Sequence, residues 1–421
     1  MSESRTRSKP SRIALYTLAT VLALGGAYAV KRILDKLEPP ELQPQQQYVK
    51  GHWQRDLPFS PDWPIKIYLP EGYTVELVTD RMSRPRMMFF DGDQLLVGSQ
   101  SDHFYRLDPP YNDPVDIGHL TDYPHSALVR DGYLYVTKMT GLYRIPYTPE
   151  TDWIEDSELE LVVSFKAHSS HNSRTVRLGP DNRLYVSMGW PKNCSNYYVH
   201  ESYPPDFRMG GILLVDETGP EPKLVPYASG LRNPVDFDWH PDTGMMYATN
   251  NGPDHLGYGQ PPEYFARVTE GSFHGMPWYQ FDGEKLVVDE CADFPAPRPI
   301  EDAEIPAATF DAHSAPLGMT FVKSDANLVK KGDAIVALHG SWVKKGGGIE
   351  GDDNERRHPK LALVKFENGE PVEVQDLVSG FQLPDGRRWA TPADVAIAPN
   401  GDIYFTSDRD IQGLFRVTRI Q

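Results

Sequence analysis

Two histidines with two residues between them, His168 and His171, open the stretch HSSHNSRTVRLGPDNRLYV (168–186). This spacing suggests a metal pair, but two such ligands need a helix face or an open loop with further ligands, and no third ligand is apparent. We therefore do not favour zinc. His171 directly precedes an apolar run, so we expect it to face a functional surface, where a neutral imidazole near its unperturbed pKa would suit proton transfer. The alternative is a histidine hydrogen-bonded between neighbouring structural units.

A second polar group lies in ASGLRNPVDFDWHPDTG (228–244). Arg232 offers a planar guanidinium that matches a carboxylate, and the amide of Asn233 both donates and accepts hydrogen bonds. Taken alone, an Arg-Asn-Pro sequence is more typical of a turn.

The loop NNGPDHLGYGQPPEYFARV (250–268) combines two kinds of oxygen ligand. Gly252 and Pro253 leave backbone carbonyl groups available, and Asp254 and Glu263 supply carboxylates. Calcium prefers such mixed oxygen ligands, although the spacing is not that of an EF-hand. The loop therefore predicts a candidate calcium site.

Other chemistries are disfavoured by context. The segment GGGIEG (346–351) matches the glycine pattern of dinucleotide-binding loops, but it lies in a charged loop with no helix after it. No G-x-S-x-G motif or Ser/His/Asp order stands out. The formal net charge of −17 argues against a nucleic-acid partner, because phosphate binding needs a basic face.

The elements that must position these residues repeat along the chain. Each repeat has a polar start, a short apolar strand, a Gly/Asp/Asn turn and a second strand, which is typical of a hairpin. The repeats occur at residues 83–97, 125–136, 171–186, 232–249, 313–338 and 391–406. Six such units predict an all-β fold, a six-bladed β-propeller over residues 61–421, in preference to an irregular β-sandwich.

In a propeller, the first strand of each blade lines the central channel. The residues that precede these strands should therefore form a ring at one channel mouth. A polar ring of this kind suits an anionic ligand. Its expected members are Arg84, His125, His171, Asn172, Arg232, Asn233, His313 and Thr391.

The N-terminal sequence indicates export. A basic segment, predicted to be cytoplasmic (1–12), precedes 18 uncharged residues (13–30) that predict a signal anchor or a signal peptide, and a Pro/Gln-rich linker (31–60) follows. We expect a periplasmic body anchored to the inner membrane by residues 13–30, with cleavage near Ala27-Tyr28-Ala29 and secretion as the alternative. Such a compartment permits a disulfide between Cys194 and Cys291, which the sequence leaves open.

Residues from about 65 to 419 resemble the pyrroloquinoline-quinone-dependent (PQQ-dependent) soluble sugar dehydrogenases, especially the sorbosone/aldose dehydrogenase branch. The resemblance rests on HNSRTVRLGPDNRLYVSMG, GLRNPVDFDWHPDTG, PPEYFARVTEGSFHGMPW, HSAPLGMTF, GDAIVALHGSW and PADVAIAPNGDIYFTSD. It implies hydride transfer from a sugar or related aldehyde to PQQ beside a calcium ion. An external quinone or cytochrome would then accept the electrons, because the chain has no CxxCH haem motif.

The resemblance also assigns roles to residues. It implies that His171 is the catalytic base and that Arg232 stabilises developing negative charge. It places the calcium ion at the carbonyl groups of Gly252 and Pro253 with Glu263, and Asp254 as a further candidate. The implied cofactor contacts are Arg232, Asn233, Asn251 and, less firmly, His125 and His313.

Two departures from the family pattern concern the grip on the cofactor. Thr391 stands where the family has arginine, so Arg387 or Arg388 would have to substitute. The family's pocket lysine has no firm match, with Lys344 or Lys345 as candidates. A non-catalytic propeller that binds glycans or protein partners in the cell envelope and a calcium-dependent lactonase therefore remain alternative functions.

Overall fold

The computed structural model describes residues 46–50 and 66–419, except residues 169, 327, 346–354 and 384. The described residues belong to one compact unit. The predicted basic segment, the apolar segment and most of the linker lie outside the described residues. Within the described part of the chain, the structure contains no helix that is long and apolar enough to cross a membrane.

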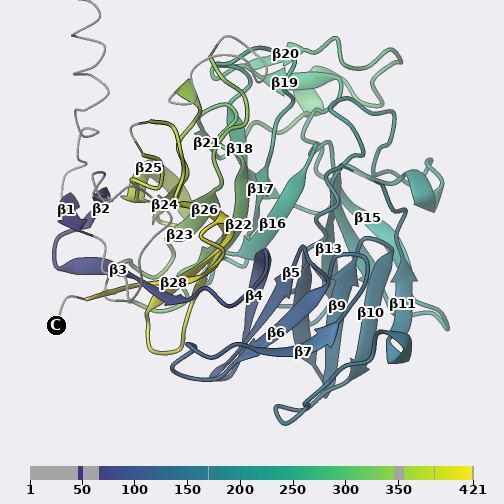
Figure 1. Cartoon of the computed structure of the whole chain (residues 1–421). Coiled ribbons are helices and arrows are strands. Elements are labelled where there is room, and N and C mark those ends of the chain that lie inside the picture. Colours follow the sequence, from purple (N-terminus) through teal and green to yellow (C-terminus); the bar gives the residue numbers. More distant parts are fainter. Residues whose placement is uncertain are drawn as a thin grey trace, which may run out of the picture. The chain divides into compact units, whose positions relative to one another are not determined.

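Six four-stranded antiparallel sheets confirm the predicted all-β, six-bladed propeller (Figure 1). Blade one consists of β4–β7 (Pro85–Asp91, Gln94–Ser99, His103–Leu107, Val115–His119), and blade two consists of β8–β11 (Ser126–Arg130, Tyr133–Lys138, Gly141–Pro146, Glu160–Ser164). Blade three consists of β12–β15 (Val176–Leu178, Leu184–Met188, Gly211–Asp216, Lys223–Ser229). Blade four consists of β16, β17, β18 and β21 (Pro234–Trp239, Met246–Asn250, Glu263–Val268, Ala308–Phe310).

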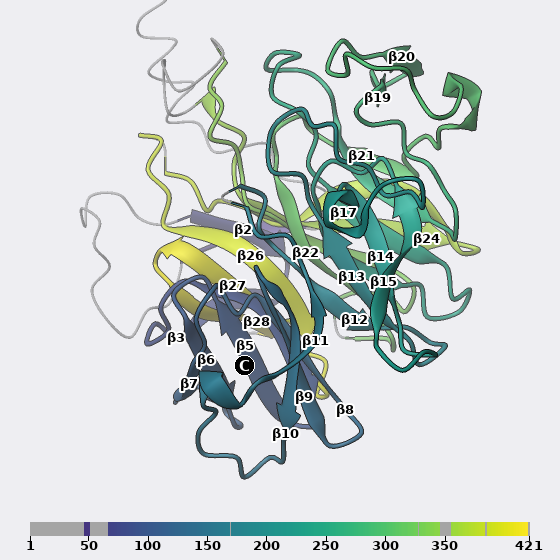
Figure 2. The same ribbon diagram turned by 90° about the vertical axis from the view of Figure 1, so that its right-hand side faces the viewer.

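Blades five and six complete the ring. They comprise β22–β25 (Pro316–Phe321, Ala334–Leu338, Lys360–Glu367, Glu370–Val378) and β26–β28 with β3 (Ala390–Ile397, Ile403–Asp410, Gly413–Arg419, Tyr73–Thr79). Neighbouring blades contact each other mainly through their first strands, and between blades three and four β13 contacts β16. Because β26 also contacts β4, the sheets close around a channel (Figure 2). The described helical segments are three short 3-10 turns, Asp156–Glu158, Pro205–Phe207 and Ile300–Asp302.

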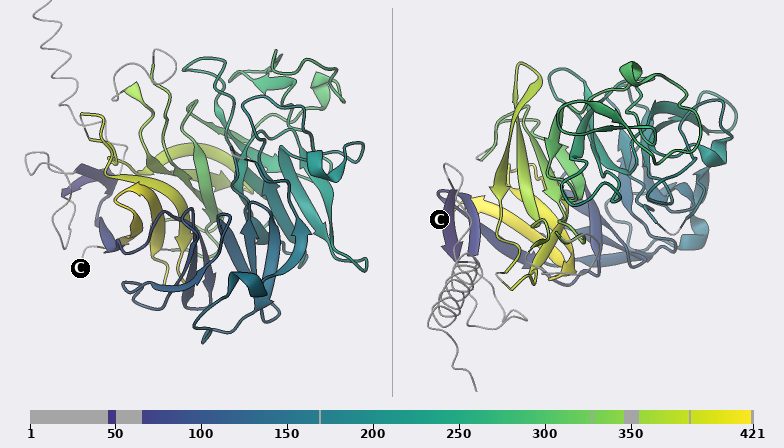
Figure 3. Two further views of the ribbon diagram at one scale, coloured as in Figure 1. Left: turned by 45° about the vertical axis from the view of Figure 1, so that its right-hand side comes forward. Right: turned by 90° about the horizontal axis from the view of Figure 1, so that it is seen from above.

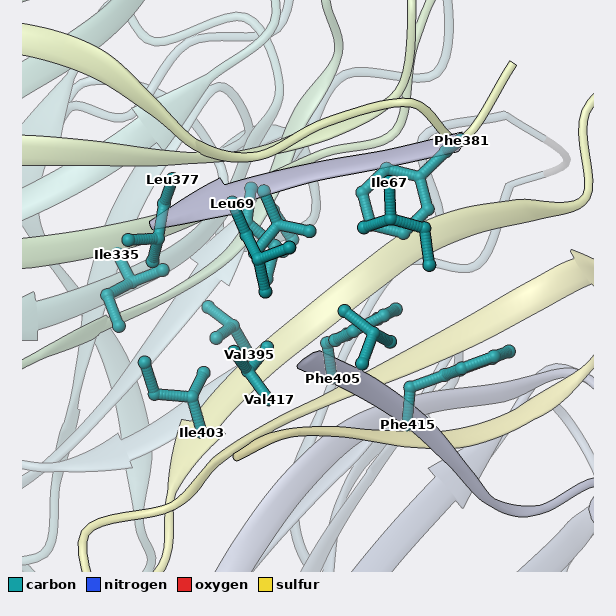
Figure 4. Packing of buried hydrophobic residues seen from close by; sticks show 14 of the residues in the cluster. Ile67, Leu69, Ile335, Leu377, Phe381, Val395, Ile403, Phe405, Phe415 and Val417 are labelled. Atoms are coloured by element: carbon teal, nitrogen blue, oxygen red, sulfur yellow. The ribbon is translucent and has the colours of Figure 1, made fainter. Parts of the chain in front are cut away.

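Ring closure joins strands from opposite ends of the chain. β3 pairs along its length with β28 and forms the outer strand of blade six, as Figure 3 shows. The hairpin repeats did not indicate this pairing. A large apolar cluster stabilises the closure, with side chains from blades five and six and from β2 (Lys66–Pro70), which pairs with β1 (Gln46–Lys50). Figure 4 shows this packing around Ile67, Leu69, Ile335, Phe405 and Phe415.

Hydroxyl groups at one repeated position connect neighbouring blades. The second strands of blades two, three, four and six read YVT, YVS, YAT and YFT. Their last residues donate hydrogen bonds to a main-chain carbonyl at the inner strand of the next blade: Thr137 to Arg174, Ser187 to Val235, Thr249 to Leu317 and Thr406 to Arg86. These buried bonds fix the spacing of the inner strands, and the residues two positions further on reach the channel mouth.

Two long excursions lie beside this mouth. One follows β13 in blade three, and the other connects β18 to β21 and contains the small hairpin of β19 (Tyr279–Phe281) and β20 (Leu286–Val288). A disulfide between Cys194 and Cys291 joins them, with 5.5 Å between the Cα atoms. The pairing that the sequence left open is therefore formed.

Candidate functional site

Residues at the channel mouth adopt a backbone conformation that side chains rarely tolerate. Arg84, His171 and His313, all members of the expected ring, have φ angles of 46°, 45° and 64°. Left-handed backbone at such residues costs free energy and persists where the surroundings enforce it, which is common at functional sites. The channel mouth is therefore a candidate functional site.

His171 is held as a neutral imidazole. Its Nδ1 lies 2.8 Å from the carbonyl oxygen of Trp190, so this nitrogen carries the proton and donates it. Burial, reinforced by the charge of Arg232, lowers the pKa of His171 to about 4. Nε2 has no hydrogen-bond partner among the described residues. The ring therefore presents an unprotonated nitrogen at neutral pH, but it is a weaker base than the imidazole near its unperturbed pKa that the sequence analysis expected.

His168 stabilises the backbone of His171 through Arg174. Its Nε2 accepts a hydrogen bond of 2.7 Å from Arg174, a completely buried arginine whose other terminal nitrogen donates to the carbonyl oxygen of His171 at 2.8 Å. Burial lowers the pKa of Arg174 to about 9 and that of His168 to about 4. The two histidines therefore do not form a metal pair. The sequence analysis missed Arg174, although a charge directly before an apolar strand is a usable signal.

Arg232 is buried and holds the loop that follows β17. Its Nε and Nη2 donate to the main-chain and side-chain oxygens of Asn193 at 2.9 and 2.8 Å. Its Nη1 donates to the carbonyl oxygens of Asn251 and Gly252 at 3.3 and 2.8 Å. The nearest carboxylate oxygen, on Asp254, lies 3.8 Å away. The guanidinium is thus bound mainly by neutral oxygens, and its positive charge is not fully compensated.

Gly189 packs closely against His171 and Asn233. The Oδ1 atom of Asn233 is buried and has no hydrogen-bond partner. A Cβ atom placed on Gly189 would lie 2.4 Å from this oxygen and 3.1 Å from the Cβ of His171. Because a larger residue would collide with Asn233, Gly189 is a residue of the site that the sequence analysis missed. Its position two residues after Ser187 could have indicated it.

The predicted calcium loop is present, but its oxygens are engaged within the protein. The Oε2 atom of Glu263 accepts the N–H of Gly252 at 2.5 Å, and burial raises the pKa of Glu263 to about 7. The amide of Asn251 donates to the carbonyl oxygen of Pro316 at 2.8 Å and so connects blades four and five. Neither of the two His/Cys/Asp/Glu groupings that could hold a metal among the described residues includes Asp254 or Glu263.

His313 and Asp254 form a pair at the edge of this loop. Nδ1 of His313 lies 3.4 Å from Oδ1 of Asp254, and Nε2 lies 2.8 Å from the carbonyl oxygen of Gly257. The hydrogen bond with His313 is the main cause that lowers the pKa of Asp254. Burial opposes charge on His313, but Asp254 and the Gly257 carbonyl outweigh it and raise its pKa. Pro253, which lies between Gly252 and Asp254 in the sequence, is buried.

The remaining predicted residues lie in internal networks. His125 is completely buried between the hydroxyl groups of Tyr123 (2.9 Å) and Thr175 (3.2 Å), so its ring connects blades two and three. Thr391 donates to Asp408 at 3.3 Å. Asp408 also lies 2.6 Å from Arg86 and 2.8 Å from His339.

The candidate substitutes for a cofactor-binding arginine are engaged in the protein. Arg388 is buried and donates to Gln382, at 3.0 Å, and to the carbonyl oxygens of Ser341 and Arg357. Arg387 is paired with Asp385.

Two further predicted residues also lie within the protein. Lys344, the candidate pocket lysine, is buried, and Asn172 donates a hydrogen bond to the sulfur of Met139.

Comparisons with known proteins agree with this architecture. A family model described as TrAA12-like matches residues 67–262. A protein of Borreliella burgdorferi described as uncharacterized is 24% identical over 361 residues, which cover 81% of this chain and 88% of that protein.

Two solved structures extend the similarity to almost the whole propeller. The calcium structure of a Trichoderma reesei enzyme of carbohydrate-active family AA12 has a TM-score of 0.69 at 18% identity and covers 88% of this chain and 100% of that one. The holo form of the PQQ domain of pyranose dehydrogenase from Coprinopsis cinerea has a TM-score of 0.64 at 18% identity, with coverage of 86% and 99%. The chain thus has the fold of PQQ sugar dehydrogenases and AA12 enzymes.

Proposed function

We propose that this protein is an oxidoreductase that oxidises a sugar or a related aldehyde with bound PQQ as the electron acceptor. One observation carries the proposal: His171 presents an unprotonated nitrogen beside the unpaired oxygen of Asn233, at the mouth of the channel. The fold is shared with a PQQ domain and with a carbohydrate-active enzyme, which supports the same substrate class.

The residues at the mouth fit a flat, anionic quinone. Gly189 lets His171 and Asn233 lie close to each other, and Arg232 adds a positive charge whose nearest carboxylate oxygen, on Asp254, lies 3.8 Å away. In this proposal Arg232, Asn233 and Asn251 hold the cofactor, with His313 at the edge of the site. His125 and Thr391 are engaged within the protein and are not proposed as cofactor contacts.

The loop oxygens fit calcium in kind, because Gly252, Pro253, Asp254 and Glu263 offer carbonyl and carboxylate groups. The carbonyl oxygen of Gly252 now accepts a hydrogen bond from Arg232. Calcium binding would therefore require this guanidinium to turn away from the loop, and it would favour the ionised form of Glu263.

The chain's own groups would handle the proton of the reaction. Nε2 of His171 accepts the proton of the substrate hydroxyl group, while the Trp190 carbonyl holds Nδ1 and fixes the ring. Burial and the charge of Arg232 disfavour the protonated ring, so the proton passes on to solvent. When bound, PQQ supplies the two-electron acceptor that takes the hydride, and an external quinone or cytochrome reoxidises it.

Reconstitution tests the proposal. The purified chain is titrated with PQQ and calcium, cofactor binding is followed by absorbance, and dye reduction is measured over a panel of aldoses and aldehydes. We expect saturable binding and dye reduction with at least one sugar. Binding without turnover would favour a non-catalytic glycan-binding propeller, and calcium-dependent hydrolysis of lactones without quinone binding would favour a lactonase.

We also propose that the propeller works outside the cytoplasm, held at the membrane by residues 13–30. The disulfide between Cys194 and Cys291 supports an oxidising compartment. Fractionation of cells combined with thiol labelling tests this: an unlabelled propeller in the membrane fraction is expected, and a reduced protein in the cytoplasmic fraction would contradict it.

A further inference from the structure

Two histidines and an aspartate meet on the outer strands of blade one, apart from the site described above. His103 begins β6, and Asp116 and His119 belong to β7, the outermost strand of that blade. His103 and His119 are direct partners across the antiparallel pair. Since directly opposite side chains project from the same face of a sheet, the register alone brings the two imidazoles together, with 4.5 Å between the ring centroids.

A β-bulge adds the carboxylate to this face. In a regular strand, side chains three positions apart, such as those of Asp116 and His119, point to opposite faces. The register of β7 shifts here, since Phe104 pairs with Gly118 and the next residue, Tyr105, pairs with Asp116. The extra residue, Ile117, is completely buried, whereas Asp116 and His119 are accessible. Bulges commonly redirect side chains in this way at functional positions.

The three side chains converge on one point. Nδ1 of His103 lies 2.7 Å from Oδ2 of Asp116, and Nε2 of His119 lies 2.9 Å from the same oxygen. All three candidate ligand atoms lie within 4.8 Å of one another. Neighbouring aromatic rings hold the imidazoles in place. The ring of Tyr105 stacks on His103, and the ring centroids of Trp153 and His119 lie 5.5 Å apart.

The ligand types select the ion. Two imidazoles with one carboxylate suit zinc and the neighbouring divalent transition metals, whereas calcium and magnesium prefer oxygen ligands alone. His119 is 60% exposed, so water has access to a further coordination position. The other described grouping with metal-ligand atoms, Cys194, His255 and Cys291, has its sulfur atoms joined in the disulfide and offers no thiolate.

We propose that His103, Asp116 and His119 bind one divalent transition-metal ion of the zinc class on the rim of blade one. The ion takes the place of the two N–H protons that now lie between the rings and the carboxylate, and each ring then carries its proton on its other nitrogen. Residues 120–125, which include Tyr123 and His125, connect His119 to β8, the inner strand of blade two. A bound ion would therefore hold the start of this connection in place. This inference does not depend on the proposed oxidoreductase activity.

Zinc titration of the full chain tests the proposal. Calorimetry is run on metal-free protein in excess calcium, so that sites built only of oxygen ligands are filled. The variants are His119→Ala, Asp116→Asn and, as a matched control, His200→Ala, an exposed histidine bonded to Ser202. We expect one zinc ion per chain in the wild type and in the control, and affinity weaker by at least about tenfold in the two site variants.

A second measurement locates the ion independently of variant stability. Anomalous scattering at the zinc edge, from crystals of the wild-type protein soaked in zinc, should give a peak between the three side chains. Equal zinc affinity in His119→Ala and His200→Ala, a peak elsewhere, or no zinc binding by the wild type would each overturn the proposal.

Discussion

The two sides of the channel mouth use polar groups in different ways. On the side of blades five, six and one, Asp408 is matched by Arg86, His339 and Thr391, all within 3.3 Å. Burial disfavours a charged Asp408, but His339 and Arg86 hold its pKa well below the usual range. On the side of blades three and four, Nε2 of His171 has no partner among the described residues and Oδ1 of Asn233 is buried without one.

This difference separates structure from chemistry. A buried charge with complete partners stabilises one conformation and has little capacity left for a ligand. A buried polar group that lacks a partner costs free energy, and a ligand that pairs with it recovers that cost. We therefore expect substitutions at His171 to affect turnover and substitutions at Asp408 to affect stability.

The largest expected effect is on turnover in His171→Ala. Loss of the base should reduce kcat by about 10²–10⁴-fold, while the affinity for PQQ measured by absorbance changes little. Dye reduction by the reconstituted enzyme measures the first quantity, with His168→Gln as a comparison that keeps the base. Unchanged turnover in His171→Ala would remove this residue from the base role.

Asp408→Ala should destabilise the fold by about 3–5 kcal/mol, because Arg86 is left buried without a carboxylate. Urea unfolding followed by tryptophan fluorescence measures the change. A loss of at most about 1 kcal/mol would be typical of an exposed ion pair. Such a result would show that the Asp408 network does not stabilise the fold as expected.

Glu263→Gln should change how stability depends on pH. The folded carboxyl has a pKa of about 7, above its ordinary value of 4.5, so between these pH values the folded state holds a proton that the unfolded state has lost. The wild type should therefore lose stability relative to Glu263→Gln as pH rises from 4.5 to 7, by at most about 1.4 kcal/mol per unit. Parallel curves of unfolding free energy against pH would contradict this.

Gly189→Ala tests the close packing of Gly189 against Asn233 and has the smallest expected effect. The new Cβ would approach Oδ1 of Asn233 to 2.4 Å, and such overpacking costs about 1–3 kcal/mol. It should appear as reduced stability or as weaker PQQ binding. Gly259→Ala is the matched control, because a Cβ there meets no atom within 4 Å. If both variants behave alike, the close packing at Gly189 has no role.

The blades could be predicted from the sequence because each hairpin is a local pattern of alternating apolar residues and turn residues. The pairing of β3 with β28 is not local, and nothing in the strand YTVELVT indicates its partner. His171 and Arg232 could be found because they stand shortly before apolar strands, five residues before β12 and two residues before β16.

Other site residues depend on contacts that the sequence does not encode locally. Asn193 reaches Arg232 from a loop 39 residues earlier in the chain. The role of Asp408 depends on Arg86, which lies 322 residues earlier in the chain. The engagement of the Gly252 carbonyl by Arg232 also could not be predicted, because the conformation of both loops decides it.

The closure of blade six by β3 has a consequence for how the propeller comes apart. In an open stack of repeats, an end repeat has one neighbour and frays first. In this ring every blade has two neighbours, so the first blade to detach must break two interfaces at once. Opening should therefore be cooperative, and the innermost amides of all six blades should exchange hydrogen at similar rates, set by global unfolding.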